Sequence, residues 1–281
     1  MIFLLLVIIA STGIIIMFRM FPRFNVDTDQ AITINYITAA LIGLLADSTH
    51  TPVSQLTHSS WFLFSVLVGV ILIIGFYLFA LSAQKAGVAV TAISSRMSVV
   101  IPVAAGFLLF GDVATSTKLA GIMLALVAFY FTSKTEKAEK ADKRYLYLPL
   151  LLFVAIGIND TSIKMAQAKF ITDDYFEFVY TSFFFAFLVG VILLFFKKKT
   201  RKISFNTVIG GVLIGAINFC SIFFLVRGLT TMPVSTFMPV YNVSVVAVSS
   251  LWGFAVFKER LSALNWAGIA LAILSIILIA M

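Results

Sequence analysis

The chain has 281 residues, of which 61% are hydrophobic and 11% are charged, and its formal net charge is +8. A soluble domain is about half apolar and about a quarter charged, so this composition excludes an ordinary soluble protein. Its apolar runs are about 20 residues long, the length that a helix needs to cross a bilayer. We therefore expect a multi-span protein of the lipid bilayer, in which loop lysines and arginines set the orientation. No nucleic-acid partner is needed to explain the positive charge.

Ten apolar segments follow one another along the chain, which predicts an all-α integral membrane fold with ten transmembrane helices. The expected spans are residues 2–21, 31–47, 61–84, 88–110, 117–133, 146–167, 175–196, 204–227, 234–256 and 263–280. No basic stretch precedes the first segment, so we interpret it as a span and not as a signal peptide. Two connections stand out: a polar loop at 47–60 and a charged run, KTEKAEKADKR, at 134–144.

Two stretches of sequence repeat each other at a fixed distance. LAGIMLALVA at 119–128 matches WAGIALAILS at 266–275, an offset of 147 positions. At nearly the same offset, Gly87-Val88 falls on Pro233-Val234 and the turn Phe110-Gly111-Asp112 falls on Phe257-Lys258-Glu259. A constant long-range offset indicates an internal repeat. We expect a first five-helix repeat at 1–133, a charged linker at 134–144 and a second five-helix repeat at 145–281.

Each expected repeat holds an odd number of spans, which fixes how the two copies are related. Tandem copies with five spans each must enter the membrane from opposite sides, so the repeats are inverted. Transporters are often built from inverted repeats, with a substrate site near the midplane between them. The alternative is that two groups of apolar helices resemble each other through composition alone.

Basic residues are distributed unequally over the expected loops. Loops after odd-numbered spans contain 15 lysines and arginines, whereas loops after even-numbered spans contain three. Because cytoplasmic loops are enriched in these residues, the count predicts that both termini lie outside.

The repeated pattern resembles the EamA-like branch of the drug/metabolite transporter superfamily. The second half carries Pro233-Val234 at a helix start and Phe257-Lys258-Glu259-Arg260-Leu261 at the following turn, close to the family's usual pattern. The first half departs from it, with Asp112 where glutamate is usual and no Arg-Leu pair afterwards. The resemblance implies secondary transport of small metabolites, often export of amino acids or toxic compounds, in the plasma (bacterial inner) membrane. It also implies cytoplasmic termini, in conflict with the charge count.

Three ionisable residues lie well inside the expected spans: Arg96, Asp160 and Lys164. Such groups are costly in hydrocarbon and normally face a cavity or a partner. Asp160 and Lys164 are four residues apart on one helix and share a face. They are either a neutralising pair that helps packing or a coupling pair whose charge state changes with substrate or proton.

Arg96 lies too far from either span end to reach the interface easily, so we expect it to face a cavity. Its guanidinium suits a carboxylate or phosphate. At the repeat offset, Tyr241 and Asn242 fall on Ser95 and Arg96. Polar groups near the same depth complete the expected substrate-binding set: Arg96, Ser95, Asn159, Asn218, Tyr241 and Asn242. For each amide, the alternative is hydrogen bonding between helices.

We expect no enzymatic activity, no catalytic residue, no metal and no cofactor. Both histidines, His50 and His58, fall in one loop, and Cys220 is alone. No phosphate-binding GxxxxGK[ST] run is present, so ATP is not expected to drive transport. A secondary carrier for a small molecule, working as a monomer, is the leading hypothesis. A passive channel or facilitator and a non-transporting membrane scaffold are the alternatives.

Overall fold

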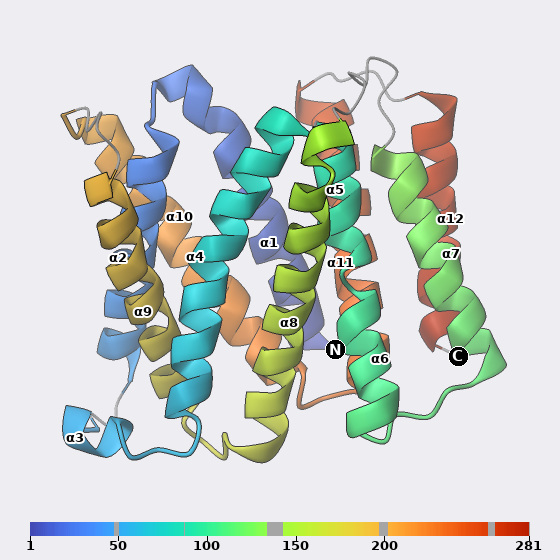
Figure 1. Ribbon diagram of the computed structural model, residues 1–281. Helices are drawn as coiled ribbons and strands as arrows, with labels where there is room; N and C mark the ends of the chain where they lie inside the picture. The colour runs from blue at the N-terminus through green and yellow to red at the C-terminus, as the bar shows by residue number, and fades with distance from the viewer. Residues whose placement is uncertain (48–50, 87, 134–142, 197–201, 258–261, 281) are drawn as a thin grey trace. The chain divides into compact units, whose positions relative to one another are not determined.

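The structure is a computed structural model that describes residues 1–47, 51–86, 88–133, 143–196, 202–257 and 262–280. Within these ranges every regular element is a helix (Figure 1). Eight helical segments there are long and apolar enough to cross a membrane, with Val90–Leu109 counted as one, and two further apolar helices, Ser116–Thr132 and Ala263–Ile279, are shorter. The expected all-helical membrane fold is confirmed, whereas the count of ten spans stays a prediction.

The helices follow the apolar segments closely. Their bounds are α1 Ile2–Met20, η1 Phe21–Phe24, α2 Thr28–Ala46, α3 Val53–Leu56, α4 Phe62–Lys85, α5 Val88–Met97, α6 Val100–Leu109, α7 Ser116–Ser133, η2 Lys143–Tyr145, α8 Tyr147–Lys169, α9 Tyr175–Phe196, α10 Phe205–Gly228, α11 Val234–Phe257 and α12 Ala263–Ala280. The polar loop expected at 47–60 contains the short helix α3. Most of the charged run at 134–144 lies outside the described residues.

The chain divides into two compact units, each with residues from both halves of the sequence. The first unit consists of Met1–Ile73 and Ser162–Thr230, and the second consists of Ile74–Thr161 and Thr231–Met281. Helices α4 and α8 each contribute residues to both units. The compact units therefore differ from the expected repeats, because packing groups helices from both repeats together.

Side-chain caps explain where two helices of the first unit begin. The Asp27 carboxylate accepts a hydrogen bond from the amide of Gln30, and the Ser204 hydroxyl accepts one from the amide of Thr207. Such caps satisfy amides that have no partner inside the helix. Helix α2 consequently begins at Thr28, earlier than the span expected from hydropathy at 31–47.

The span expected at 88–110 is broken into two helices. Pro102 has no amide hydrogen, so the Ser98 carbonyl cannot form its normal helical bond. It accepts instead from the amide of Ile101, at 3.0 Å. This tighter turn ends α5 immediately after the turn that carries Arg96, and α6 continues beyond it (Figure 1).

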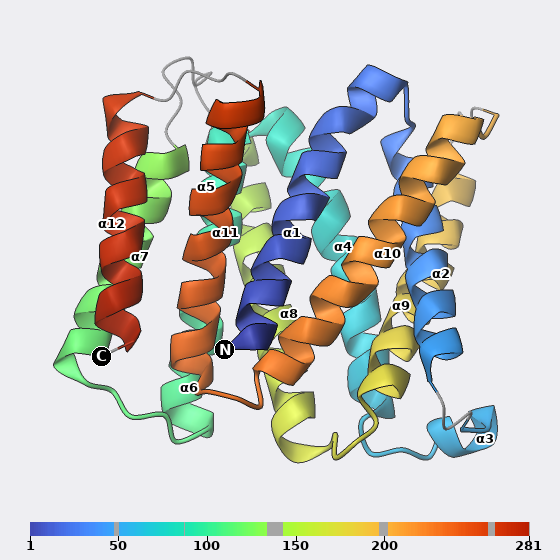
Figure 2. The same cartoon turned by 180° about the vertical axis from the view of Figure 1, so that it is seen from behind.

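Helices α7 and α12 of the second unit run side by side in both views (Figures 1 and 2). A Cβ atom built on Gly121 would lie 2.7 Å from the Cγ1 atom of Ile279, and one built on Gly268 would lie 2.7 Å from the amide nitrogen of Thr132. From Gly121 to Thr132 the chain moves forward along α7, while the contacted residues move backward along α12 from Ile279 to Gly268. The two helices are therefore antiparallel. The two contacts are equivalent at the repeat offset: Gly268 lies 147 positions after Gly121, and Thr132 lies 147 positions before Ile279.

The same exchange recurs in the first unit, between α2 and α9. A Cβ built on Gly43 would lie 2.7 Å from the Cβ of Tyr180, and one built on Gly190 would lie 3.3 Å from the Oγ1 of Thr33. These two contacts also exchange at an offset of 147 positions, and they make α2 and α9 antiparallel.

A second exchanged pair in the first unit joins α4 to α9 and α10 to α2. Gly69 approaches the carbonyl of Ser182, and Gly215 approaches the carbonyl of Asn35, where a Cβ would lie 2.7 Å from the oxygen. An offset of 146 relates the glycines and an offset of 147 relates their partners. Glycine is needed at such crossings because any side chain would separate the helices.

Asp112 links the loop after α6 to the start of α11. Its Oδ2 atom accepts a hydrogen bond of 2.8 Å from the amide of Ser235. The preceding Gly111 has φ = +70°, a conformation that glycine adopts easily, and this turn directs the carboxylate toward α11. Asp112 therefore caps the start of α11, although it lies more than 100 positions earlier in the chain. Its carboxylate satisfies a free amide of the first helical turn, as a local Asp or Asn cap does.

We predict that Gly121→Ala destabilises the protein by about 1–3 kcal/mol, because the new methyl group meets the Ile279 backbone, which cannot move away cheaply. Thermal unfolding of the purified protein in detergent measures the effect. Gly75→Ala in α4 is the matched control, since a Cβ there would meet nothing within 4 Å. Equal melting temperatures for the two variants would contradict the close crossing.

We predict that Asp112→Ala costs about 1 kcal/mol through loss of the cap on α11, whereas Asp112→Asn costs less because its amide oxygen still accepts from Ser235. Thermal unfolding again measures both. Asp173→Ala, at an exposed position before α9, serves as the control. If alanine and asparagine at position 112 are equally harmful, the carboxylate does not act as a cap.

Candidate functional site

The candidate site in the second unit is built around Arg96, which is half-buried near the end of α5. Its Nη1 atom donates a hydrogen bond of 3.2 Å to the Oδ1 atom of Asn242 on α11. Asn242 is buried and its Nδ2 atom donates to the carbonyl of Met238, one turn earlier, at 3.1 Å. This second bond fixes the orientation of the amide, so its oxygen faces the guanidinium.

Asp160 on α8 supplies a carboxyl group. It interacts electrostatically with Arg96, which also interacts with Tyr241, the neighbour of Asn242. The side-chain amide of Asn159 donates a hydrogen bond to Asp160, while the buried Oδ1 atom of Asn159 has no hydrogen-bond partner among the described residues. The cluster therefore combines a guanidinium, a carboxyl group, a phenol and an unpaired acceptor oxygen.

A close helix crossing brings Asp160 to this cluster. Gly157 precedes Asp160 by about one turn, and a Cβ built on it would lie 2.7 Å from the Cβ of Ile101 on α6. Because Gly157 has no side chain, α8 approaches α6 closely near the break between α5 and α6. Ile101 is also the residue whose amide bonds Ser98 at that break.

Ser95 lies beside Arg96, but its hydroxyl is already used within α5. Its Oγ atom donates to the carbonyl of Ala92 at 2.9 Å, and the Ser95 carbonyl accepts from the hydroxyl of Ser98 at 2.7 Å. The Ser95 oxygen can still accept a hydrogen bond from a ligand. Its donor, however, supports the helix just before the break.

Two residues of the expected set belong to the first unit. The Nδ2 atom of Asn218 on α10 donates to the Oδ1 atom of Asn35 on α2 at 3.1 Å. The ammonium of Lys164 donates to Gln167 Oε1 at 2.7 Å and to the carbonyl of Leu229 at 3.0 Å. The structure thus brings Arg96, Asn159, Asp160, Tyr241 and Asn242 together in one unit, and it gives Asn218 and Lys164 partners of their own in the other.

The partners of Asn218 were not foreseen from the sequence. Asn35 is buried in α2, and the hydroxyls of Ser11 on α1 and Ser221 on α10 form a buried hydrogen bond of 2.7 Å. In the sequence, these contacts are marked only by polar residues inside apolar segments. Short polar side chains such as serine are common in such segments, so they do not identify a contact. Only the pairing of α10 with α1 and α2 shows that they form polar contacts between helices.

Two buried carboxylates at one end of the first unit were also missed. Asp47 and Glu177 are each less than 5% exposed, and both interact electrostatically with Tyr180. Glu177 Oε1 accepts from the hydroxyl of Thr51 at 3.3 Å. Their positions at the ends of expected spans made them look like ordinary loop acids.

The chemistry of the cluster in the second unit is that of a binding site for a polar group. A guanidinium held by one amide has further N–H donors available for a carboxylate or phosphate, which it binds in a planar, bidentate manner. The carboxylate of Asp160 can accept from an ammonium. The described residues contain no group of three His, Cys, Asp or Glu side chains that could hold a metal ion.

Comparison with known proteins places this geometry in context. Residues 144–281 match the EamA-like transporter family. Over 285 aligned residues the chain is 27% identical to an uncharacterized protein of Haemophilus influenzae (strain ATCC 51907 / DSM 11121 / KW20 / Rd), covering 97% of this chain and 95% of that protein. A solved structure described as "Crystal structure of protein" aligns with a TM-score of 0.83 over 99% of this chain and 94% of that chain, at 10% identity.

The likeness to the solved structure shows the fold alone, because the identity is low. The family match carries more, since it points to a transporter and away from an enzyme, and it agrees with the apolar helices in placing the protein in a membrane. Residues 144–281 thus match the EamA-like transporter family, in agreement with the resemblance of the chain to the drug/metabolite transporter superfamily.

Proposed function

We propose that this protein is a secondary active transporter that exports small metabolites, such as amino acids or amphipathic compounds, by alternating access around a midplane cavity. We propose further that it is built from ten spans in two inverted five-helix repeats and works as a monomer. The observation that carries the transport function is the Arg96–Asn242 contact beside Asp160, in a chain whose second half is an EamA-like domain.

The exchanged glycine contacts support inverted repeats. When a twofold axis relates two repeats, each contact between them occurs twice. If residue i of the first repeat contacts the counterpart of residue j in the second, then residue j of the first contacts the counterpart of residue i. The pairs Gly43–Tyr180 with Gly190–Thr33, and Gly121–Ile279 with Gly268–Thr132, follow this rule. Because α2 and α9, and likewise α7 and α12, are equivalent helices that run antiparallel, the two repeats would cross the membrane in opposite directions.

The position of Arg96 supports a central site. Arg96 and Asn242 are separated by 146 residues, which is the repeat offset, so Arg96 contacts its own counterpart in the other repeat. Two equivalent positions can touch only where they lie close to the twofold axis. In transporters with inverted repeats, the substrate site lies at the interface of the repeats near the bilayer midplane.

The charges favour a substrate that has an anionic group. A carboxylate or phosphate would bind the free N–H groups of Arg96, and Asp160 would balance an ammonium or take up a proton. A zwitterion such as an amino acid has a carboxylate for Arg96 and an ammonium for Asp160. Coupling to proton entry would let the gradient drive export, with Asp160 as the carrier and Lys164 as a second coupling residue on the same helix.

A passive channel or facilitator remains the alternative from another class, and a non-transporting scaffold is the third. Counterflow in liposomes distinguishes them. A carrier is stimulated by substrate on the opposite side, a channel conducts without such stimulation, and a scaffold does neither. The midhelix charges favour the first two, because a scaffold has no use for ionisable groups that are costly in a bilayer.

We predict that Arg96→Ala weakens substrate binding by about tenfold to a hundredfold, the range expected for loss of a hydrogen bond to a charged group. Arg96→Lys should restore only part of it, since an ammonium cannot reproduce the planar fork. A thermal-shift screen of metabolites finds the ligand first, because ligands of the folded state raise its stability. Arg144→Ala, at an exposed position in η2, is the control. A ligand that stabilises wild type and Arg96→Ala equally would remove Arg96 from the site.

We predict that Asp160→Asn abolishes the pH dependence of counterflow while leaving the melting temperature close to that of wild type. Asparagine keeps the shape of the carboxyl group and one acceptor oxygen, but it cannot exchange a proton. Counterflow is measured over a pH series with equal pH on both sides, for wild type, Asp160→Asn and Lys164→Gln. Asp160 interacts electrostatically with Arg96, which also interacts with Tyr241. An unchanged pH profile in Asp160→Asn would show that the proton is carried elsewhere.

A further inference from the structure

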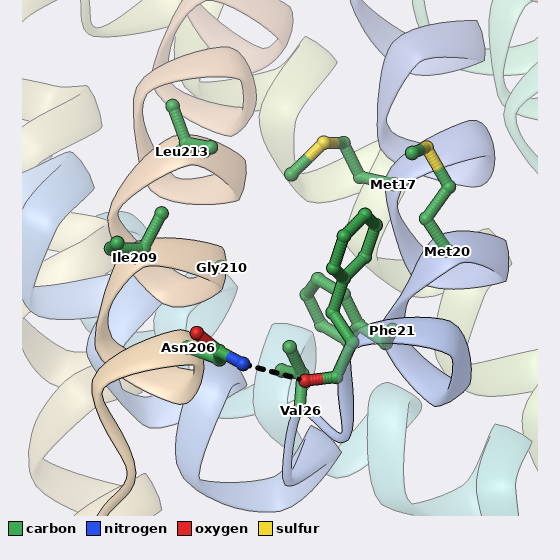
Figure 3. Close-up of a pocket in the computed structure, with 9 residues that line it drawn as sticks. Met17, Met20, Phe21, Val26, Asn206, Ile209, Gly210 and Leu213 are labelled. Carbon is green, nitrogen blue, oxygen red and sulfur yellow. Dashed lines mark hydrogen bonds between the residues drawn. The ribbon is translucent and has the colours of Figure 1, made fainter.

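An apolar groove in the first unit lies where the end of α1 and η1 face the start of α10 (Figure 3). Its volume is about 310 Å³. Its lining consists of Met17, Met20, Phe21, Phe24, Val26, Asn206, Ile209, Gly210 and Leu213. No residue of the substrate site proposed above lines it.

The floor of the groove is firmly packed, whereas its walls are adaptable. Phe21 is 3% exposed and packs with Ala31 and Ile214 in a buried cluster. Met17 and Met20 form one wall, and methionine side chains adjust to irregular apolar ligands. A rigid floor with adaptable sides suits a flexible hydrocarbon chain.

The groove is open along one side. Leu213 is 50% exposed and Ile209 is 41% exposed, although both are large apolar residues. In a membrane-spanning helix such faces contact lipid and not water. The groove is therefore accessible to an acyl chain directly from the bilayer.

A polar cavity of about 320 Å³ adjoins the groove, because Val26 lines both. Its other lining residues are Pro22, Asn25, Asp27, Lys202, Ser204 and Thr207. The Nδ2 atom of Asn206 donates to the carbonyl of Phe24 at 3.0 Å and so holds η1 against α10 beside this cavity (Figure 3). An apolar groove next to a polar cavity matches an amphipathic ligand.

The charges around the polar cavity favour an anionic headgroup. Lys202 lines it, and Arg23 in η1 is exposed nearby in the chain. Asp27 also lines it, but its Oδ1 atom accepts from the amide of Gln30, so its negative charge faces the start of α2. Basic pockets between membrane helices bind anionic lipid headgroups.

We propose that this groove and its adjoining polar cavity form a binding site for one anionic phospholipid, with an acyl chain along Met17, Met20 and Leu213 and the phosphate near Lys202. The site lies at the end of α1 where the basic loops predict the cytoplasmic leaflet, in which anionic lipids attract basic residues. The lipid would hold η1 and the start of α10 together independently of any transported substrate.

The test is native mass spectrometry of the purified full-length protein in neutral detergent, with phosphatidylglycerol and phosphatidylcholine of identical acyl chains. Wild type should retain one phosphatidylglycerol in preference to phosphatidylcholine. Lys202→Gln should weaken phosphatidylglycerol binding by about fivefold, as expected for one basic residue near the headgroup, and leave phosphatidylcholine binding unchanged. Lys169→Gln, at an exposed position ending α8, should change neither.

Filling the groove tests the acyl-chain site. Met20→Trp should abolish the retained phosphatidylglycerol, whereas Met123→Trp, at a residue of α7 that is 63% exposed, should not. If Met20→Trp does not fold, Leu213→Trp fills the groove from the opposite wall. Equal lipid retention in the groove-filling variant and Met123→Trp would overturn the proposal. So would equal binding of the two lipids by wild type, or a protein dimer that the groove-filling variant dissociates.

Discussion

The close crossing of antiparallel helices at glycine is the constraint on which the rest of this structure depends. At Gly43, Gly121 and Gly268 a neighbouring helix occupies the space that a side chain would need, and at Gly190 the contact is tight. In a bilayer, helices gain little from hiding apolar surface from one another, so association relies on close packing and on hydrogen bonds. These glycines permit that packing. The contact at Gly43 has its counterpart at Gly190, and the contact at Gly121 has its counterpart at Gly268, each 147 positions later in the chain.

The same kind of crossing places the charges. Gly157 lets α8 approach α6, and this approach brings Asp160 into electrostatic contact with Arg96. Arg96 in turn depends on Asn242, whose amide is held by the Met238 carbonyl. A buried cation without partners would be costly, so the order of dependence runs from helix packing to amide orientation to the guanidinium. The binding chemistry is a consequence of the packing.

Much of the fold could be predicted from sequence, because the thickness of a bilayer sets the apolar length of each spanning helix. The helix bounds fall close to the expected spans, and Arg96, Tyr241, Asn242 and Asp160 do come together. The break after α5 could be suspected from Pro102 but not located, since Pro239 occupies α11 without interrupting it. The partners of Asn218 and Lys164 depended on which helices neighbour one another, and hydropathy carries no such information.

The two halves differ at the candidate site, because Asn242 stands at the position of the second half that corresponds to Arg96. A perfectly symmetric pair of repeats would treat the two sides of the membrane alike. Here Arg96 faces Asn242 at equivalent positions, and the helix that carries Arg96 is broken whereas its counterpart α11 continues through Pro239. At the break, the Ser98 carbonyl accepts from the amide of Ile101, whereas α11 has no such interruption between Val234 and Phe257. If the proposed repeats alternate during transport, a helix break beside Arg96 in one repeat alone makes their two arrangements unequal, so substrate or proton binding would favour one opening over the other.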